Sequence, residues 1–516
     1  MKKRVSVLLL IYVFVFSFTS LTTVFSQENK AKTEFQVKGF HLDLRIQVMT
    51  PKALKSFAKE LAGFGINTLI LEWEATYPYE KHATISNEFA YTRAEVKSFI
   101  DYCEGLEIDV IPLQQCFGHV EYILRNERYG HLKEDWKEIS QVCPLKIEDN
   151  KTLFKDLFKD MASMHNSDYI HIGGDETYLL GHCNECSAKA EEVGKSKLFV
   201  DYMTTMSDII LELGKKPIMW ADIVLEHPEA ANDLSKDIIF IDWNYGWETN
   251  HFGDVGNLQQ KGFTFWGSPA IRSSPDNWYI TNWDKHFNNQ RDFIPYSRNA
   301  GYKGMVMTSW STSGIYGLTV CDEGYKVLDM QQIRNVYPLS GFRILIASYA
   351  EALKNQGAID PERFVVSYAA ERFGLNEKDG AELWKALSIS RDLIFKGKPL
   401  AEIMANSNTA HEIFYKLKPL KNKKEFEHYR LINDLRQFYL ATYQIETMYN
   451  SGEFSVGNSE DLKPKLEALK IESKKLDKRF KKLHQGFLYD SEIEDQNNIR
   501  NLAFNILYNR INKTRN

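Results

Sequence analysis

The chain has 516 residues, a formal net charge of −5 at pH 7 and a sequence pI of about 6.3. A single hydrophobic core stops growing at roughly 250–300 residues, so this length predicts one large domain and a second one. A weakly acidic chain has no basic field to hold a phosphate backbone, which argues against a nucleic-acid partner.

Residues 1–26 have the order of a secretory signal peptide. Lys2-Lys3-Arg4 precede an apolar run from Val5 to Phe18, and small and polar residues follow as far as Ser26. This order predicts cleavage near Ser26 and export to the periplasm or the medium. The alternative is an uncleaved anchor helix, but the run is shorter than the ~20 residues that span a bilayer. We expect no stable membrane span after cleavage.

Eight short apolar segments then alternate with mostly helical ones. The apolar segments are residues 35–44, 66–73, 108–113, 169–172, 217–220, 238–243, 263–266 and 305–310. Their number and spacing favour an α/β fold, a (β/α)8 barrel, over an open doubly wound sheet.

Local signals mark some of the intervening helices. Thr50-Pro51 provides an N-cap and a first-turn proline, and Thr92 with Glu95 forms a capping box. Further helices are expected at about 151–165 and, as one long helix, up to about Leu213.

The alternation stops near residue 321, and amphipathic helical segments follow. We therefore predict a barrel over residues 27–345 and a helical C-terminal domain over 346–516. Composition does not say whether this tail packs on the barrel, forms dimers or covers a binding site, and the oligomeric state stays open.

Polar and aromatic side chains recur where the predicted strands end. They are His41, Asp43, Glu72, Glu74, His119, Asp175, Glu176, Asp222, Asp242, Tyr245, Trp266 and Trp310. These strand ends form the mouth of a barrel, where catalytic groups lie. Carboxylic acids can protonate a leaving oxygen and indole rings can stack on a sugar, so this set suits cleavage of glycosidic bonds.

Asp175 and Glu176 are adjacent in the sequence. An acid and a nucleophile that bracket a sugar must lie on opposite sides of the anomeric carbon, which adjacent residues do not readily do. The pair therefore points to one acid and one carboxylate that supports a nucleophile within the substrate, such as a C2 acetamido group. Both side chains can face one sugar only if the backbone leaves strand geometry, and Gly173-Gly174 permits this. The alternative is an acidic pair that caps a helix N-terminus.

His171-Ile172-Gly173-Gly174-Asp175-Glu176 resembles the His-x-Gly-Gly-Asp-Glu signature of the family 20 glycoside hydrolases, the β-N-acetylhexosaminidases. The resemblance covers about residues 35–320 and extends to Lys38-Gly39-Phe40-His41-Leu42-Asp43, Phe117-Gly118-His119, Trp220, Trp243 and Trp310. Segments 41–44, 77–80, 111–114 and 177–181 are most similar to the hexosaminidase D-like branch.

The resemblance implies a role for each matching residue. Glu176 would be the general acid and then the general base, and Asp175 would orient the acetamide and stabilise an oxazolinium ion. Tyr245 would donate to the acetamide carbonyl. The other implied substrate-binding residues are Lys38, Asp43, His119, Trp220, Trp243 and Trp310.

The implied reaction is exo-acting, retaining removal of terminal β-linked GlcNAc or GalNAc from a glycan, without a cofactor or a metal. Lys38 stands where many members have a sugar-binding Arg, and Arg45 could share that task. Where many members have a Trp-x-Glu pattern on the last strand, this chain has Trp310-Ser311-Thr312, so the choice between the two sugars stays open. The short segment before the first strand predicts that the small N-terminal domain of many members is missing.

Other interpretations remain for parts of the chain. The six cysteines are Cys103, Cys116, Cys143, Cys183, Cys186 and Cys321. Cys183 and Cys186 could form a disulfide or stay buried thiols, or could join His182 in a zinc site that lacks a fourth ligand. The barrel could bind amino sugars without turning them over. It could also be a metal-dependent hydrolase that uses His171, Asp175, Glu176 and His182.

Overall fold

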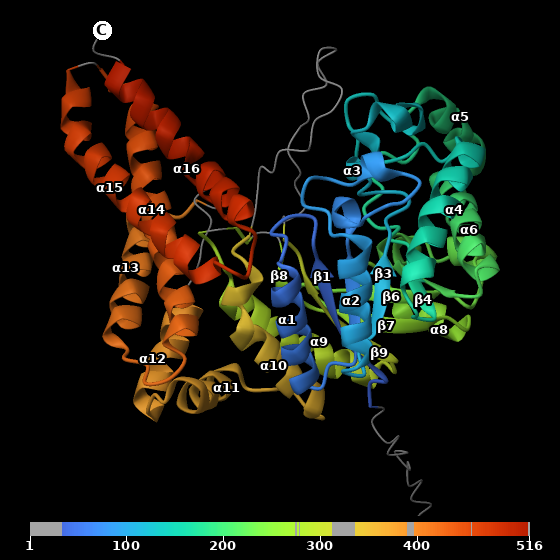
Figure 1. The fold of residues 1–516 in the computed structure, drawn as a ribbon, viewed down its shortest axis with the longest axis horizontal. Helices are drawn as coiled ribbons and strands as arrows, with labels where there is room; N and C mark the ends of the chain where they lie inside the picture. The colour runs from blue at the N-terminus through green and yellow to red at the C-terminus, as the bar shows by residue number, and fades with distance from the viewer. Residues whose placement is uncertain are drawn as a thin grey trace, which may run out of the picture.

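The computed structural model describes residues 34–273, 276–277, 279–311, 336–389, 397–455 and 457–513. A closed barrel of parallel strands with surrounding helices is followed by a layer of C-terminal helices (Figure 1). The predicted fold, a (β/α)8 barrel followed by helices, is confirmed. The predicted signal peptide and Cys321 lie outside the described residues.

The barrel strands coincide with the eight predicted apolar segments. They are β1 (Val37–Asp43), β2 (Thr68–Glu72), β3 (Asp109–Leu113), β4 (Tyr169–His171), β5 (Lys216–Trp220), β6 (Ile239–Trp243), β7 (Thr264–Ser268) and β9 (Gly304–Ser309). Each strand pairs in parallel with the next, and β9 pairs with β1 to close the barrel. A short additional strand, β8 (Ala270–Arg272), lies beside β9.

Helices surround this barrel. They are α1 (Pro51–Gly63), α2 (Arg93–Glu104), α3 (Glu121–Leu124), α4 (Ile147–Met164), α5 (Asn184–Val193), α6 (Lys195–Glu212), α7 (Asp222–Glu226), α8 (Val255–Gln260), α9 (Trp283–Asn299) and α10 (Arg343–Lys354). The Thr50 side chain caps α1, and Thr92 with Glu95 forms the predicted capping box of α2. The long helix predicted up to Leu213 is wrong, because Gly194 at φ +87° separates α5 from α6.

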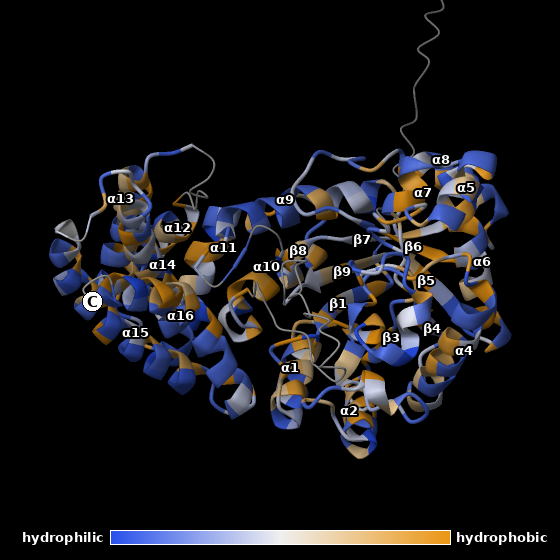
Figure 2. Ribbon diagram, turned by 90° about the horizontal axis from the view of Figure 1, so that it is seen from above, coloured by the Kyte–Doolittle hydropathy of each residue, from blue (hydrophilic) through white to orange (hydrophobic). Residues whose placement is uncertain are grey.

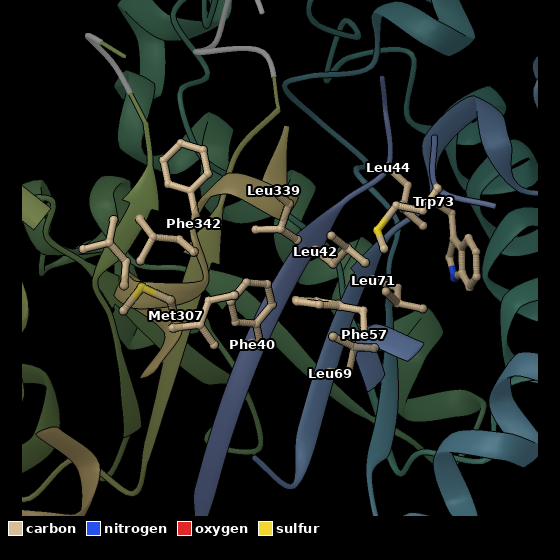
Figure 3. Packing of buried hydrophobic residues seen from close by; sticks show 14 of the residues in the cluster. Phe40, Leu42, Leu44, Phe57, Leu69, Leu71, Trp73, Met307, Leu339 and Phe342 are labelled. Carbon is tan, nitrogen blue, oxygen red and sulfur yellow. The ribbon is translucent and has the colours of Figure 1, made fainter. Parts of the chain in front are cut away.

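Alternation along β1 divides its side chains between two cores. Phe40 and Leu42 point outward and pack near Phe57 of α1 and Leu69 and Leu71 of β2 (Figure 3). Residues between them face the barrel interior. The interior is filled by residues that include Ile70, Ile111, Leu113, Ile218, Trp220, Ile241 and Val306. This packing makes the barrel a rigid support for the loops at its C-terminal end.

The C-terminal layer consists of α11 (Pro361–Tyr368), a π-helical turn (Ala369–Phe373), α12 (Glu377–Ser388), α13 (Leu400–Lys416), α14 (Lys423–Tyr449), α15 (Lys463–His484) and α16 (Asp490–Lys513). Figure 2 shows this layer beside the barrel. Thr50 N–H donates to the Phe487 carbonyl at 2.9 Å, and Met49 forms an antiparallel bridge with Leu488. The tail therefore packs on the barrel where α1 begins.

Helix α10 spans the predicted domain boundary between residues 345 and 346. Its Tyr349 hydroxyl lies 2.9 and 2.8 Å from the carbonyl oxygens of Gly39 and Met305, in strands β1 and β9. We therefore assign the whole of α10 to the barrel. Among the described residues, none of the helices is both long and apolar enough to cross a membrane.

Candidate active site

A pocket of about 330 Å³ opens at the C-terminal ends of the barrel strands. Its lining contains most of the predicted site residues, namely His119, Asp175, Glu176, Trp220, Trp243, Tyr245 and Trp310, together with Arg45, Tyr178, Trp247, His251, Phe252 and Ser273. A larger hollow of about 870 Å³ is lined by α10, α11 and residues around them, and none of the predicted site residues belongs to that lining.

The backbone after β4 turns both carboxylates toward the pocket. Gly173 and Gly174 have φ values of +73° and +94°, and Glu176 has a φ of +47°. These left-handed conformations end the alternation of a strand, as the sequence predicted. A Cβ atom on Gly173 would lie 1.8 Å from Gln115 Oε1, so only glycine fits there without a shift of Gln115.

His119 lies between the two carboxylates. Its Nε2 is 3.3 Å from Asp175 Oδ2 and 3.3 Å from Glu176 Oε2. Burial favours the neutral imidazole, but the charge of Asp175 and hydrogen bonds to both acids raise the pKa of His119 well above its usual value. His119, whose contact the sequence did not specify, is therefore an imidazolium that bridges the pair.

Glu176 has two further hydrogen-bond partners. The Tyr178 hydroxyl donates to Glu176 Oε1 at 2.8 Å, and the Glu176 N–H donates to Asp222 Oδ2 at 3.1 Å. Burial opposes ionisation of Glu176, but the hydrogen bond and charge of His119 outweigh it and lower the pKa of Glu176. The free site therefore favours the ionised form of this carboxyl.

Asp175 has one oxygen engaged and one available. Oδ2 faces His119, whereas the buried Oδ1 has no hydrogen-bond partner among the described residues. A buried carboxylate oxygen without a partner is costly, so a donor from a ligand would be favoured at this position.

The Asp222 carboxylate contacts both Glu176 and Trp243. Its Oδ1 accepts from Trp243 Nε1 at 3.4 Å and its Oδ2 accepts the Glu176 N–H. Burial and the charge of Asp175 raise the pKa of Asp222 to about 8, so this carboxyl is largely neutral at pH 7. The sequence showed Asp222 only as one of several strand-end carboxylates.

Aromatic rings form the rest of the wall. The ring centroids of Trp220 and Trp310 are 5.9 Å apart, and Trp310 Nε1 donates to the Tyr245 hydroxyl at 2.9 Å. The loop after β6 adds Trp247 and Phe252 to this wall. The ring centroids of Trp247 and Trp243 are 5.5 Å apart. Sequence reasoning missed these loop aromatics, although their clustering after Trp243 was a visible signal.

The placement of Lys38 in the pocket is wrong. Lys38 lies near the start of β1, at the opposite end of the barrel, and its Nζ bonds Glu34 Oε1 at 2.6 Å in a solvent-exposed pair. The physical reason is length, because most of the strand separates Lys38 from the mouth. The pocket lining instead contains Arg45, whose guanidinium carbon lies 5.3 Å from the centroid of the Trp310 ring.

Asp43 acts on the pocket through Arg45 and does not line it. Its Oδ2 lies 2.9 Å from Arg45 Nη2 and accepts from the Ser311 N–H and hydroxyl at 2.9 and 2.8 Å. Burial would raise the pKa of Asp43, but the charge of Arg45 and these hydrogen bonds lower it to about 2. The predicted contact of Asp43 with the sugar is therefore wrong, because the Asp43 carboxylate binds Arg45 instead.

Two other strand-end residues also lie away from the mouth. The Asp242 carboxylate accepts from the Tyr302 hydroxyl at 2.6 Å, outside the pocket lining. Trp266 packs against Tyr169 in the barrel interior, with ring centroids 5.8 Å apart. Alternation explains Asp242, since it and its neighbour Trp243 face opposite sides of the strand. Trp266 faces the interior, but it pairs with Gly304 at the start of β9 and therefore lies below the mouth.

The hypothesis of a metal-dependent hydrolase requires His171 and His182 beside the carboxylate pair. His171 is buried and its Nδ1 accepts the Gly173 N–H at 3.0 Å, whereas His182 Nε2 lies 3.0 Å from Asp135 Oδ2. Within the part of the chain that the structure describes, these histidines and Asp175 and Glu176 do not form a group with metal-ligand spacing.

Comparisons with known proteins agree with this site. Residues 68–320 match the sequence model of the glycosyl hydrolase family 20 catalytic domain. Hexosaminidase D of Bos taurus is 26% identical over 288 residues, which are 52% of this chain and 83% of that protein. Hexosaminidase D of Homo sapiens is 24% identical over 304 residues, which are 55% of this chain and 62% of that protein.

A solved structure shares the fold. The β-N-acetylhexosaminidase from Bacteroides fragilis NCTC 9343 superposes with a TM-score of 0.50 at 16% identity, over 65% of this chain and 70% of that one. The barrel of this chain therefore belongs to glycosyl hydrolase family 20, and the chain is a glycoside hydrolase of the β-hexosaminidase type.

Proposed function

We propose that the chain is an exo-acting, retaining β-N-acetylhexosaminidase that removes terminal β-linked GlcNAc or GalNAc by substrate-assisted catalysis. The observation that carries this proposal is the state of Asp175. Its Oδ1 is buried and without a partner among the described residues, and it lies on the same pocket as Glu176. An acetamide N–H is a donor that would satisfy this oxygen.

The reaction begins with Glu176, which in its acid form protonates the glycosidic oxygen. As the bond from C1 to that oxygen breaks, the carbonyl oxygen of the acetamide attacks C1 and closes an oxazolinium ring. Asp175 accepts the acetamide N–H and offsets the positive charge of the ring, an interaction that is strongest near the transition state. Glu176 then takes a proton from water, which attacks C1, opens the ring and leaves the β-configuration unchanged.

The pocket's other residues would bind and orient the sugar. Trp220, Trp243 and Trp310 provide apolar faces for the pyranose ring and the acetamide methyl group. Tyr245 carries a hydroxyl at the wall, where it could donate to the acetamide carbonyl. Arg45 takes over the role that the resemblance gave to Lys38, because its guanidinium can bind two adjacent sugar hydroxyls.

The size of the pocket supports removal of a single terminal sugar. A volume of about 330 Å³ is at the small end of ligand pockets, which span roughly 300–1,000 Å³. We propose that one hexosamine fills it and that the remaining glycan stays outside. The basic, apolar and small residues of positions 1–26 support export, so the proposed substrates are glycans outside the cytoplasm.

Three nitrophenyl glycosides test the proposed function. We expect purified protein to release nitrophenol from the β-N-acetylglucosaminide or the β-N-acetylgalactosaminide and to fail on the β-glucoside, which has no acetamido group. Comparable turnover of the glucoside would rule out substrate assistance. The ratio of the two N-acetyl rates then gives the sugar preference.

A further inference from the structure

Three thiols and one carboxylate meet beside the active-site loops. Cys143 precedes α4, Cys183 and Cys186 lie at the start of α5, and Glu134 follows the turn Glu127–Leu132. The Sγ of Cys143 is 3.5 Å from that of Cys186 and 3.9 Å from that of Cys183, and Glu134 Oε2 is 3.3 Å from Cys186 Sγ. All four ligand-type atoms lie within 4.8 Å of one another.

Three of these separations are close to the edges of a zinc tetrahedron. Zinc binds thiolate sulfur at about 2.3 Å and carboxylate oxygen at about 2.0–2.2 Å, which gives edges of roughly 3.8 Å between two sulfurs and roughly 3.5 Å between sulfur and oxygen. The observed distances of 3.5, 3.9 and 3.3 Å lie close to these values. The three cysteines are free thiols in the structure, not a disulfide.

The buried position of Glu134 favours a cation beside its carboxylate. Its side chain is buried, with 3% exposure, and forms no ion pair with a Lys, Arg or His of the described residues. The N–H groups of His182 and Cys183 donate to Oε1 at 2.8 and 2.9 Å, which turns Oε2 toward the sulfur atoms. A buried carboxylate that faces thiols is unfavourable unless positive charge lies between them.

The start of α5 is also suited to hold thiolates. Cys183 is the N-cap of this helix, and the Cys186 N–H donates to Cys183 Sγ at 3.4 Å. Hydrogen bonds from backbone N–H groups and the positive end of a helix both lower the cost of an ionised thiol. Similar contacts outside the ligand shell orient the ligands of known metal sites.

We propose that Cys143, Cys183, Cys186 and Glu134 bind one Zn²⁺ ion as a closed structural site. Three soft sulfur ligands select zinc over calcium or magnesium, and four protein ligands leave no open position for chemistry. The sequence pointed only to Cys183, Cys186 and His182. Cys143 and Glu134 come from another loop, and His182 bonds Asp135 instead.

The ion would join two loops that carry catalytic groups. Cys143 and Glu134 belong to the connection after β3, which also contains His119, and Cys183 and Cys186 follow the segment from Asp175 to Tyr178. A second link supports this connection, because Gln141 Oε1 accepts the Leu179 N–H at 3.0 Å. The metal site would therefore fix the position of His119 relative to Asp175 and Glu176.

Metal analysis of the full-length protein tests the proposal. After incubation with equimolar Zn²⁺ and desalting, we expect one zinc per chain in the wild type, and loss of that zinc in the double variant Cys183→Ser, Cys186→Ser. Cys103→Ser removes a buried thiol of α2, outside the cluster, and should keep its zinc. Wild-type protein that retains no zinc would overturn the proposal, as would a disulfide at Cys143, Cys183 or Cys186 found by peptide mass mapping.

Two measurements remain informative if the double variant does not fold. Blocking the thiols of the wild type with a mercurial should release zinc in step with three reacted thiols, and release without dependence on thiols would contradict the site. Replacement of zinc by Co²⁺ should give the intense visible absorption of tetrahedral cobalt thiolate. Glu134→Gln should speed the transfer of zinc to a chelating dye, and an unchanged rate would remove Glu134 from the ligand set.

Discussion

Asp175 and Glu176 are adjacent in sequence but have different tasks at the residue scale. For Glu176→Gln we expect kcat/KM to fall by about 10²–10⁴-fold on oligosaccharides, whose leaving groups need a proton, and by less on nitrophenyl glycosides. For Asp175→Asn we expect a loss in kcat with little change in KM, because the charge that Asp175 offsets exists only near the transition state. Steady-state kinetics on both substrate types checks these patterns. Equal losses on all substrates for Glu176→Gln would contradict its role as the acid.

His119 controls the proton of Glu176. Because the imidazolium lowers the pKa of Glu176, its removal should raise that pKa and keep the acid form to higher pH. His119 has a φ of +54°, a conformation that asparagine tolerates, so His119→Asn is the suitable variant. We expect the alkaline limb of its pH profile of kcat/KM to move to higher pH.

Tyr178→Phe provides a graded comparison for this prediction. Tyr178 donates one uncharged hydrogen bond to Glu176, so its loss should move the same limb in the same direction by a smaller amount. Identical limbs in the wild type and both variants would contradict the assignment of that limb to Glu176.

The sequence predicted the catalytic pair but not all of its surroundings. Asp175, Glu176, His119 and the three tryptophans could be found because each lies at a strand end, and strand ends meet at one mouth. The exchange of Lys38 for Arg45 could not, since it depends on where β1 begins. The support given by Asp222 depends on a contact with the Glu176 N–H from the end of the neighbouring strand, β5.

At the scale of elements, the turn after β4 decides whether the pair can work. Gly173→Ala forces alanine into a left-handed conformation and places its Cβ 1.8 Å from Gln115 Oε1. We expect kcat/KM to fall by about 10²-fold, since a shift of about 1 Å in a catalytic group has an effect of that size.

Gly214 offers a matched control. Its φ of +72° is almost that of Gly173, but a Cβ there would meet no atom within 4 Å. Gly214→Ala should therefore cost only about 1–2 kcal/mol of left-handed strain and leave kcat/KM unchanged. Equal stability losses and equal activity in the two variants would show that the close contact with Gln115 is unimportant.

The elements themselves were largely predictable. Continuous apolar runs identified every barrel strand, and Thr50 and Thr92 marked two helix starts through capping. The break between α5 and α6 was missed because Gly194 is one residue within an otherwise helical pattern. A single glycine is often tolerated inside a helix, so only the observed left-handed φ decides.

At the scale of the whole molecule, the C-terminal helices support the barrel mouth from the side. Glu492 of α16 is buried and accepts hydrogen bonds from the backbone of Gln47 and Val48, in the loop that follows Arg45. The sequence left this docking open, since a charged helix gives no sign of its neighbour. The proposed zinc site could not be recognised from the sequence either, because its four ligands lie on separate loops.

The docking of α16 should depend on pH through Glu492. Burial raises the pKa of Glu492, and hydrogen bonds from Gln496 and the Gln47 backbone partly oppose this effect. The resulting pKa is about 7. Because the folded pKa is above the usual 4.5, this group favours the fold at low pH, and its contribution is lost as pH rises from about 4.5 to about 7. The full effect is about 3 kcal/mol at about 1.4 kcal/mol per pKa unit.

Glu492→Gln cannot ionise and should lose this pH dependence. Thermal unfolding of both proteins from pH 5 to pH 9 checks the prediction, with both values of Tm compared at each pH. We expect the Tm of the variant to rise relative to the wild type as pH increases. Parallel curves would show that Glu492 does not titrate in this range in the folded protein.

The proposed mechanism depends on the substrate's own acetamide as the nucleophile beside Asp175 and Glu176. The most direct measurement is kcat/KM for a series of nitrophenyl β-glucosaminides that carry N-acetyl, N-fluoroacetyl, N-difluoroacetyl and N-trifluoroacetyl groups. Each fluorine makes the carbonyl oxygen a weaker nucleophile while the sugar and the leaving group stay the same. We predict a steep decline of kcat/KM with each added fluorine, whereas a flat series would show that another nucleophile attacks C1 and would contradict the mechanism.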